Sequence, residues 1–429
     1  MIRINFLLLF FLALYLFQVV FSLWLEAVNR RHLREKGTQV PEAFLGFIDQ
    51  EKLARSNAYT LENSRFGMLQ EIWGAIILLA LLLSDFLPFL EHLTRSWQWP
   101  YLLSGLFFFL IPGLITSLLD LPWDYYHTFV IEEKYGFNKS TLKIWIMDQI
   151  KAGLISLVLF SLILSIILWM IRSFPNTWWL WGCMTLLGIQ LLLAVLYPLL
   201  IAPLFNKFEP IRDQDLAEKI TRLMEEAGIR LKGLFQMDAG KRSRHTNAYF
   251  TGLGRSKRIV LFDTLITAHP HEEVLAVLAH EVGHFKGRHI WKQFLLFGIT
   301  TVMAFYFSYL LLDWPLLYRT FGFETEPPYV GLFLLGILGQ KIGFFAAPLY
   351  AALSRHYERE ADRFALTLLK SSSAMITGLK RLGADNLSNL FPHPWYVRFH
   401  YSHPPLLERI NTLKESTGTS TPQKKDGQR

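Results

Sequence analysis

The stretch His280-Glu281-Val282-Gly283-His284 holds residue types that can bind a metal and move a proton. On a helix, His280 and His284 are four residues apart, so both imidazoles project from one face. This spacing lets two neutral nitrogens reach one Zn²⁺ at about 2.0–2.1 Å. Glu281 lies beside them and is placed to act as general base on a zinc-activated water. The alternative is a chance match among the 13 histidines of the chain.

Most of the chain that must position this motif is apolar. The sequence has 429 residues, of which 52% are hydrophobic and 15% aromatic, and its mean hydropathy is +0.27. The apolar residues form long blocks, a pattern typical of a polytopic membrane protein. The net charge of +8 then fits cytoplasmic loops that face anionic lipid, and we expect no nucleic-acid partner. The single cysteine, Cys183, excludes an internal disulfide framework and a cysteine zinc site.

Seven apolar blocks are each long enough to cross a hydrocarbon core of about 30 Å. They cover residues 4–25, 68–90, 102–120, 150–172, 178–204, 291–313 and 328–352. A cleaved signal peptide is the competing interpretation of the first block. No small-x-small cleavage site follows that block, so we predict a retained helix.

The loops between the blocks differ in charge. With seven crossings, the segments 26–67, 121–149, 205–290 and 353–429 share one face. These segments are rich in Lys and Arg, whereas the opposite loops carry few basic residues. The positive-inside rule therefore predicts that the face with the His280 motif is cytoplasmic and that the N-terminus is outside.

The segment 205–290 is the one substantial polar insertion between apolar blocks. Residues 213–228 predict an amphipathic helix that ends at a glycine. Short strands are predicted at 235–238, 246–250 and 258–262, and the last two flank residues 251–257, which suit a hairpin turn. Pro270 begins a further helix that carries the metal-binding motif.

Two histidines leave a catalytic zinc site one protein ligand short. Glu358, just past the seventh block, is a candidate, and a helix there would put Asp362 on the same face. Asp362 could accept a hydrogen bond from a ligand imidazole. Two histidines and a glutamate suit Zn²⁺ better than Mg²⁺, which prefers oxygen. The alternative for Glu358 is a solvated helix charge, and the spacing leaves both open.

Peptide hydrolysis also needs a donor for the developing oxyanion and a place for the substrate backbone. His403, in Tyr401-Ser402-His403-Pro404-Pro405, is a candidate donor, with an ordinary turn residue as the alternative. The segment Asn247-Ala248-Tyr249 could pair with an extended peptide by strand addition. Its alternative is an ordinary strand whose side chains only pack.

Together these residues resemble the type I CAAX prenyl protease family, integral membrane zinc endopeptidases of the gluzincin kind. The HEVGH stretch resembles the metal helix of the family, the segment from Ser354 to Asp362 its third-ligand helix, and Asn247-Ala248-Tyr249 its substrate strand. Other similar segments are Glu133 to Asn138, Asn386 to Leu390, and Tyr401 to Pro405 with Arg409. The resemblance extends over residues 1–415.

The resemblance implies the fold class of an α-helical polytopic membrane protein. Seven transmembrane helices would surround an intramembrane chamber, capped by a cytoplasmic α+β gluzincin-like zinc metallopeptidase domain. It also implies one Zn²⁺ per chain with Glu358 as third ligand, His403 as a catalytic-site donor, and Arg409 paired with a carboxylate, for which Asp362 is the candidate. A chamber would explain the polar residues Asp85, Gln340 and Lys341 within apolar blocks, with snorkelling or structural pairing as the alternative.

We therefore divide the chain into five parts. They are residues 1–204 with transmembrane helices 1–5, 205–290 with the peptidase insertion, 291–352 with helices 6–7, 353–415 with the third ligand, and 416–429 as a disordered tail. We predict a multi-pass protein of the cytoplasmic membrane in a prokaryote or of the endoplasmic reticulum membrane in a eukaryote. The active site would face the cytoplasm.

By resemblance, the predicted function is removal of the last three residues of isoprenylated proteins that end in Cys-a-a-X. The expected partners are the lipid bilayer and a peptide or protein substrate, isoprenylated or not. One alternative is a quality-control metalloprotease that acts on non-prenylated membrane proteins. Another is a seven-helix receptor or transporter with an incidental motif, against which the third-ligand segment argues. An intramembrane protease of the site-2 type is disfavoured because HEVGH begins before an apolar block rather than inside one.

Overall fold

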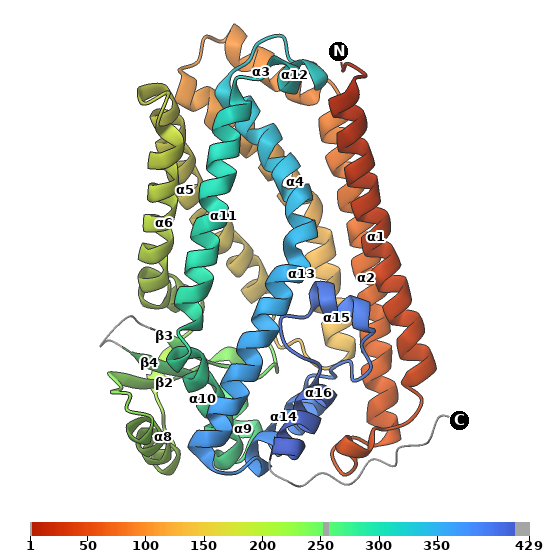
Figure 1. Ribbon diagram of the computed structural model, residues 1–429, viewed down its shortest axis with the longest axis vertical. Helices are drawn as coiled ribbons and strands as arrows, with labels where there is room; N and C mark the ends of the chain where they lie inside the picture. Colours follow the sequence, from red (N-terminus) through yellow and green to blue (C-terminus); the bar gives the residue numbers. More distant parts are fainter. Residues whose placement is uncertain (1, 252–256, 417–429) are drawn as a thin grey trace. The chain divides into compact units, whose positions relative to one another are not determined.

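The computed structural model describes residues 2–251 and 257–416, and the chain divides into two compact units (Figure 1). The first unit comprises Met1–Ala27, Glu62–Phe205 and Trp291–Ala347. The second unit comprises Val28–Leu61, Asn206–Ile290 and Pro348–Arg429. Each unit is therefore assembled from segments that are far apart in the sequence.

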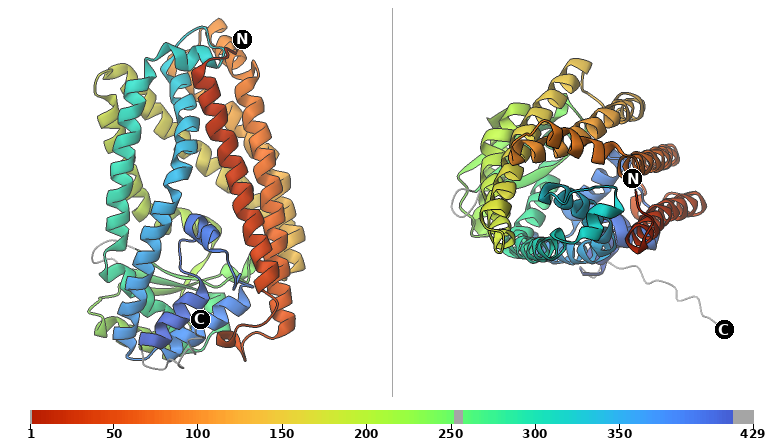
Figure 2. Two further views of the ribbon diagram at one scale, coloured as in Figure 1. Left: turned by 45° about the vertical axis from the view of Figure 1, so that its right-hand side comes forward. Right: turned by 90° about the horizontal axis from the view of Figure 1, so that it is seen from above.

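Seven helical stretches in the described part of the chain are long and apolar enough to span a membrane, which confirms the predicted number. They are α1 (Phe6–Lys36), α2 (Gln50–Leu83), α4 (Tyr101–Tyr126) with the π-helical segment η2 (His127–Glu132), α5 (Leu142–Ser173), α6 (Trp178–Leu196) with the π-helical segment η3 (Tyr197–Ile201) and α7 (Ala202–Phe205), α11 (His289–Leu312), and α13 (Pro328–Leu369). Within the first unit α1 and α2 lie side by side (Figure 2), and the Ser22 hydroxyl of α1 donates a hydrogen bond of 2.9 Å to Glu71 of α2. There α4 packs on α5, and α5 packs on α6.

The predicted block 68–90 is wrong as a single helix. Helix α2 ends at Leu83, and a separate helix α3 (Phe86–Ser96) follows Asp85. Pro88 has no N–H to donate to the carbonyl of Ser84, and it lies in the first turn of α3, where backbone N–H groups have no partner within the helix. Asp85 therefore lies between two helices and not inside a spanning helix.

The polar segment 26–66 is largely helical. Helix α1 continues to Lys36, α2 already begins at Gln50, and a short turn η1 (Glu42–Phe44) lies between them. The Asn57 side chain donates a hydrogen bond of 2.7 Å to the carbonyl of Gly37, just past the end of α1. Hydropathy marks only the part of a helix that suits lipid, so it misses these polar extensions.

Lys341, one of the polar residues within the apolar blocks, contacts an aromatic ring of the first unit. Its Nζ lies 4.7 Å from the ring centroid of Tyr15. A cation over a ring face is a favourable structural contact. The intramembrane chamber that the resemblance implies stays a prediction.

The second unit contains a four-stranded sheet with the order β1-β2-β4-β3. Its strands are β1 (Phe208–Pro210), β2 (Gly233–Met237), β3 (Ala248–Thr251) and β4 (Arg258–Phe262). Strands β3 and β4 are antiparallel, with Ala248 opposite Leu261, whereas β2 and β4 are parallel. Three strands were expected; the sequence pattern misses β1, which is three residues long and ends in a proline. Residues 252–256 of the predicted hairpin turn lie outside the described residues.

The second unit also contains shorter helices, one of which carries the metal-binding motif. They are α8 (Gln214–Glu226), α9 (Asp263–Ala268), α10 (His271–Lys286), α14 (Ser373–Asp385), α15 (Pro394–His400) and α16 (Leu406–Ser416), with the short turn η4 (Ala239–Lys241); α12 (Pro315–Thr320) belongs to the first unit. Asp213 caps α8 by accepting the Leu216 N–H, and Gly228, at φ +65°, follows the helix end as predicted. Of the predicted disordered tail 416–429, Ser416 is the last residue of α16, and the rest lies outside the described residues.

The apolar face of α10 anchors the motif in the core of the second unit. Val274, Leu278 and Val282 are fully buried at spacings of four residues. They pack with buried residues of β4 and α8 in one cluster, and α10 contacts α8, α14 and β3. Because this stripe faces the core, the residues between its members are held at a defined angle around the helix.

Candidate metal centre

The site depends on a close approach between α10 and α13. A Cβ on Gly283 would lie 2.7 Å from the Cα of Ala361 and 2.8 Å from its carbonyl oxygen. Atoms at these distances would overlap, so the glycine of HEVGH is what lets the two backbones meet. Ala361 lies between Glu358 and Asp362, so their side chains project near the histidines of α10.

Replacing Gly283 by Ala should destabilise the second unit by about 1–3 kcal/mol, because the colliding atoms belong to the backbone and cannot rotate away. Unfolding of the purified protein in detergent measures this change. The matched control is Gly378→Ala, also within a helix, where a Cβ would lie an ordinary 3.5 Å from the Cβ of Glu273. Equal stabilities of the two variants would contradict the prediction.

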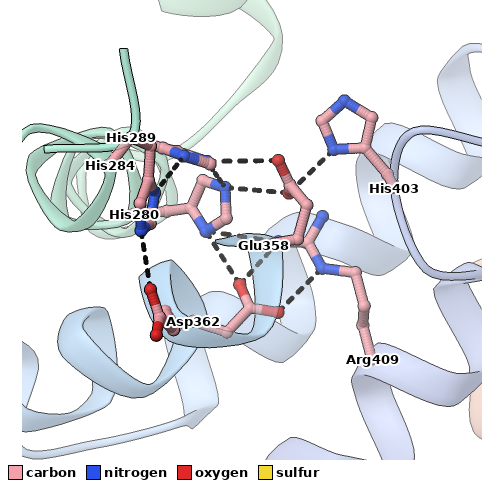
Figure 3. Close-up of polar contacts among 8 residues, drawn as sticks. His280, His284, His289, Glu358, Asp362, His403 and Arg409 are labelled. Carbon is pink, nitrogen blue, oxygen red and sulfur yellow. Dashed lines mark hydrogen bonds and ion pairs between the residues drawn. The ribbon is translucent and has the colours of Figure 1, made fainter. Parts of the chain in front are cut away.

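Three side chains converge at the contact of α10 and α13 (Figure 3). His280 Nε2 and His284 Nε2 are 3.1 Å apart. His280 Nε2 lies 3.2 Å from one oxygen of Glu358, and His284 Nε2 lies 3.1 Å from the other. The Glu358 side chain is only 4% exposed. One ligand atom from each residue fits within 4.8 Å of the others, a spacing at which a single ion can contact all three.

Asp362 controls which nitrogen of His280 carries the proton. The Asp362 carboxylate accepts a hydrogen bond of 2.8 Å from His280 Nδ1. Arg409 in turn binds both oxygens of Asp362, at 2.9 Å from Nε and 2.6 Å from Nη2. With Nδ1 protonated, the Nε2 lone pair of neutral His280 points toward Glu358.

This donor set fits a cation. Two imidazole nitrogens and a buried carboxylate oxygen point at one position, and acceptors in this arrangement repel one another unless a positive charge lies between them. Burial lowers the pKa of His280, but its bonds to Asp362 and Glu358 outweigh burial and raise the pKa to about 9. The same negative field that favours a proton there favours a metal ion. Nitrogen ligands with one carboxylate suit Zn²⁺.

Glu281 and His403 line one cavity together with His280. Burial raises the pKa of the Glu281 carboxyl above its usual range. His403 Nδ1 lies 2.7 Å from a Glu358 oxygen, and the His403 side chain is 62% exposed. The loop that carries His403 is held by Arg355, which donates hydrogen bonds to the carbonyls of Val397 (2.9 Å) and Tyr401 (2.6 Å).

A cavity of about 170 Å³ in the second unit brings most of the predicted site residues together. Its polar lining comprises Thr246, Asn247, Glu273, His280, Glu281, His403 and Arg409. Its apolar lining includes Ala248, Leu265, Val277, Met375, Leu379 and Leu382. The cavity therefore joins the metal-binding motif to the strand β3 and to the loop before α16.

Tyr249 lies apart from the other two residues of its segment. Successive side chains of a strand point to opposite faces, so Tyr249 points away from the side of Ala248. Its ring contacts that of Phe262 and belongs to a cluster with Met237 and Val260. In the structure Tyr249 packs and is not among the residues that line the cavity.

Sequence reasoning missed His289, which contacts His284, and two residues that contact His289. His289 is bonded to His284, Glu360 is bonded to His289, and the ring of Tyr357 stacks on His289. A signal was present, because His289 follows the motif by five residues and Glu360 and Tyr357 lie next to the third-ligand position. The hydropathy pattern gave no reason to assign His289 to the site, because a polar residue just before an apolar block is typical of the end of a membrane helix.

Two protein-family models together match most of the chain. Residues 29–207 match the model for the CAAX prenyl protease N-terminal region with five membrane helices, and residues 210–417 match peptidase family M48. The chain is 36% identical over 420 residues to the CAAX prenyl protease 1 homolog of Arabidopsis thaliana, covering 94% of this chain and 96% of that protein. It is 33% identical over 412 residues to CAAX prenyl protease 1 of Saccharomyces cerevisiae, covering 90% of each.

A solved structure is also similar over nearly the whole chain. The crystal structure of S. mikatae Ste24p matches with a TM-score of 0.88 and 31% sequence identity, covering 94% of this chain and 98% of that one. Agreement of this extent includes the membrane helices as well as the sheet and the motif helix. The comparisons confirm the family that the motifs predict: the chain belongs to the CAAX prenyl protease 1 group of peptidase family M48 and is a multi-pass membrane metalloendopeptidase.

Proposed function

We propose that this enzyme binds one Zn²⁺ through His280, His284 and Glu358 and removes the last three residues of isoprenylated proteins that end in Cys-a-a-X. The observation that carries the zinc site is the convergence of three acceptor atoms within 4.8 Å of one another. The substrate class comes from the similarity to proteins named CAAX prenyl protease 1, which extends over at least 90% of the chain. When bound, the Zn²⁺ would lower the pKa of a water molecule and polarise the scissile carbonyl.

The residues of the chain then have separate tasks. Glu281 takes the proton of the attacking water and later returns it to the leaving amine, a role for which its raised pKa is suited. His403 donates a hydrogen bond to the oxygen that becomes negative on the substrate. Asp362 and Arg409 hold His280 in the tautomer that leaves Nε2 free.

Strand β3 offers a way to hold an extended peptide. It is the terminal strand of the sheet, and Asn247 and Ala248 line the cavity beside Glu281. A substrate backbone added along β3 would bring its carbonyls past Glu281 in a sequence-independent manner. Asn247 and Ala248 are therefore proposed as substrate-binding residues, whereas Tyr249 supports the strand by packing.

The location follows from charge and hydropathy. The segments of the second unit are rich in Lys and Arg, and positive loops stay in the cytoplasm. We accordingly assign the metal site to the cytoplasmic side of the membrane. In a eukaryote this would be the endoplasmic reticulum membrane, and in a prokaryote the cytoplasmic membrane.

Cleavage of a farnesylated Cys-a-a-X peptide tests the substrate. The farnesylated peptide should be cut faster than an unprenylated peptide of the same sequence, because the lipid raises its local concentration at the membrane and adds buried apolar area. The rates are measured side by side with the purified protein in detergent and again in vesicles. Glu281→Gln serves as the blank for both peptides.

Equal rates with the two peptides would remove lipid recognition from the proposal. In that case the non-prenylated substrates of a quality-control protease would become the better description of the same chemistry. Absence of any metal-dependent hydrolysis would contradict the chemistry itself.

A further inference from the structure

His289 is a buried histidine to which the proposed reaction assigns no role. It is the first residue of α11, and its side chain is 2% exposed. The ring stacks on Tyr357 with centroids 4.4 Å apart and an interplanar angle of 14°. On another side it lies against Gly287, where a Cβ would collide with the imidazole. Packing on these sides holds the ring in one orientation.

Both ring nitrogens of His289 have polar partners. Nδ1 lies 2.9 Å from Nδ1 of His284, and Nε2 lies 2.8 Å from a carboxylate oxygen of Glu360. Figure 3 shows His289 directly beside His284, on the side away from Glu358. The other oxygen of Glu360 lies 3.2 Å from Nε2 of His356, a surface residue.

The donor and acceptor chemistry of these groups determines the direction of each hydrogen bond. An ionised carboxylate can only accept, so Nε2 of His289 donates to Glu360. A neutral imidazole has one N–H, so Nδ1 of His289 is then an acceptor. It then accepts from Nδ1–H of His284, which leaves the lone pair of His284 on Nε2, the atom that faces Glu358.

We propose that Glu360 and His289 form a positioning pair that holds His284 in its metal-binding tautomer and orientation. The inference rests on the proposed metal site, because it assigns a role to residues behind one of its ligands. His280 receives the corresponding support directly from Asp362, whereas His284 receives it from Glu360 through an intervening imidazole. The two ligand histidines are therefore set by two independent carboxylates on α13.

The break between α10 and α11 is what places His289 behind His284. In a continuous helix, residue 289 would lie roughly 140° around the axis from residue 284, at 100° per residue. The chain instead leaves α10 at Gly287 and turns through Arg288, whose φ is +54°. Residues other than glycine seldom adopt this conformation, and it persists where the surrounding structure requires it.

The Zn²⁺ affinity of variants tests the role of the positioning pair. The full-length protein in detergent is titrated against a chromophoric chelator, as wild type and as His289→Phe, His289→Asn and Glu360→Leu. Phe keeps a ring on Tyr357 but offers no acceptor, and Leu removes the carboxylate that sets the tautomer. Both should weaken Zn²⁺ binding by about 10–100-fold. Asn can present its Oδ1 near the position of the imidazole Nδ1 and should recover most of the affinity.

Two further measurements separate positioning from stability. The variant His289→Phe with Glu360→Leu should bind Zn²⁺ no more weakly than His289→Phe alone, because Glu360 acts through His289. The visible absorption of bound Co²⁺ should change in His289→Phe and remain that of the wild type in the control His356→Phe, which leaves the bond between Glu360 and His289 intact. Unfolding of the metal-free variants is recorded alongside.

Wild-type zinc affinity in His289→Phe would overturn the inference while leaving the metal site in place. The inference would also be overturned if His289→Phe and His289→Asn weakened Zn²⁺ binding equally and in proportion to their loss of stability without metal. A wild-type protein that binds no Zn²⁺ would overturn the proposed metal site together with this inference. The first two results are therefore distinguishable from failure of the proposed function.

Discussion

Replacing Glu281 by Gln should lower the turnover number by about 10²–10⁴-fold and leave the zinc content unchanged. The amide keeps the shape of the side chain but cannot take a proton from water, and this range is typical for loss of a general base. Glu281 lines the cavity with His280 but is not one of the three converging groups, so metal binding should survive. Peptidase rates and zinc per chain are measured on the same preparation.

Glu272→Gln is the matched control. This substitution makes the same chemical change on the same helix, but at an exposed position in the first turn. It should retain wild-type activity. A Glu281→Gln protein that cleaves at the wild-type rate would refute the proposed proton transfer. A variant that loses its zinc would instead move Glu281 into the group that holds the metal.

Replacing Glu358 by Ala should abolish stoichiometric zinc binding, and activity should disappear with it. This carboxylate is the third of the converging groups, and its removal leaves two histidines of one helix from that group, whereas catalytic zinc usually has three protein ligands. The loss should exceed the roughly 10–100-fold typical of residues that only support a ligand. Metal content after dialysis against a weak chelator provides the measurement.

Glu415→Ala tests whether loss of any carboxylate has this effect, since Glu415 is exposed on α16. It should keep one Zn²⁺ per chain. Full zinc occupancy in Glu358→Ala would take Glu358 out of the metal site and leave the two histidines in need of another partner.

Local sequence patterns determined much of the site. Residues four apart on a helix share a face whatever surrounds them, so the pairs His280 with His284 and Glu358 with Asp362 could be read from spacing alone. Long apolar blocks predicted the seven spanning helices, because crossing lipid requires about 20 apolar residues in a row. Glycine and aspartate predicted the ends of α8.

Spacing could not show how these faces meet. Whether Glu358 was a ligand or a solvated charge depended on the contact of α10 with α13, which the missing side chain of Gly283 permits against Ala361. The partner of Arg409 was only a candidate until the fold brought Asp362 within 2.6 Å of it. Alternation along β3 required the sheet to be in place before Tyr249 could be assigned to the packed face.

The sequence by itself determined the zinc-binding motif, the number of membrane helices and the family resemblance, because these follow from periodicity and residue type within short stretches. Only the tertiary structure decided that α2 ends before Pro88, that Asn247 and Ala248 share a cavity with Glu281, and that His289 lies behind His284. The last of these depends on a left-handed residue at Arg288, which is not a conformation that its side chain favours. Contacts of this kind arise from packing between distant segments, where no local pattern can record them.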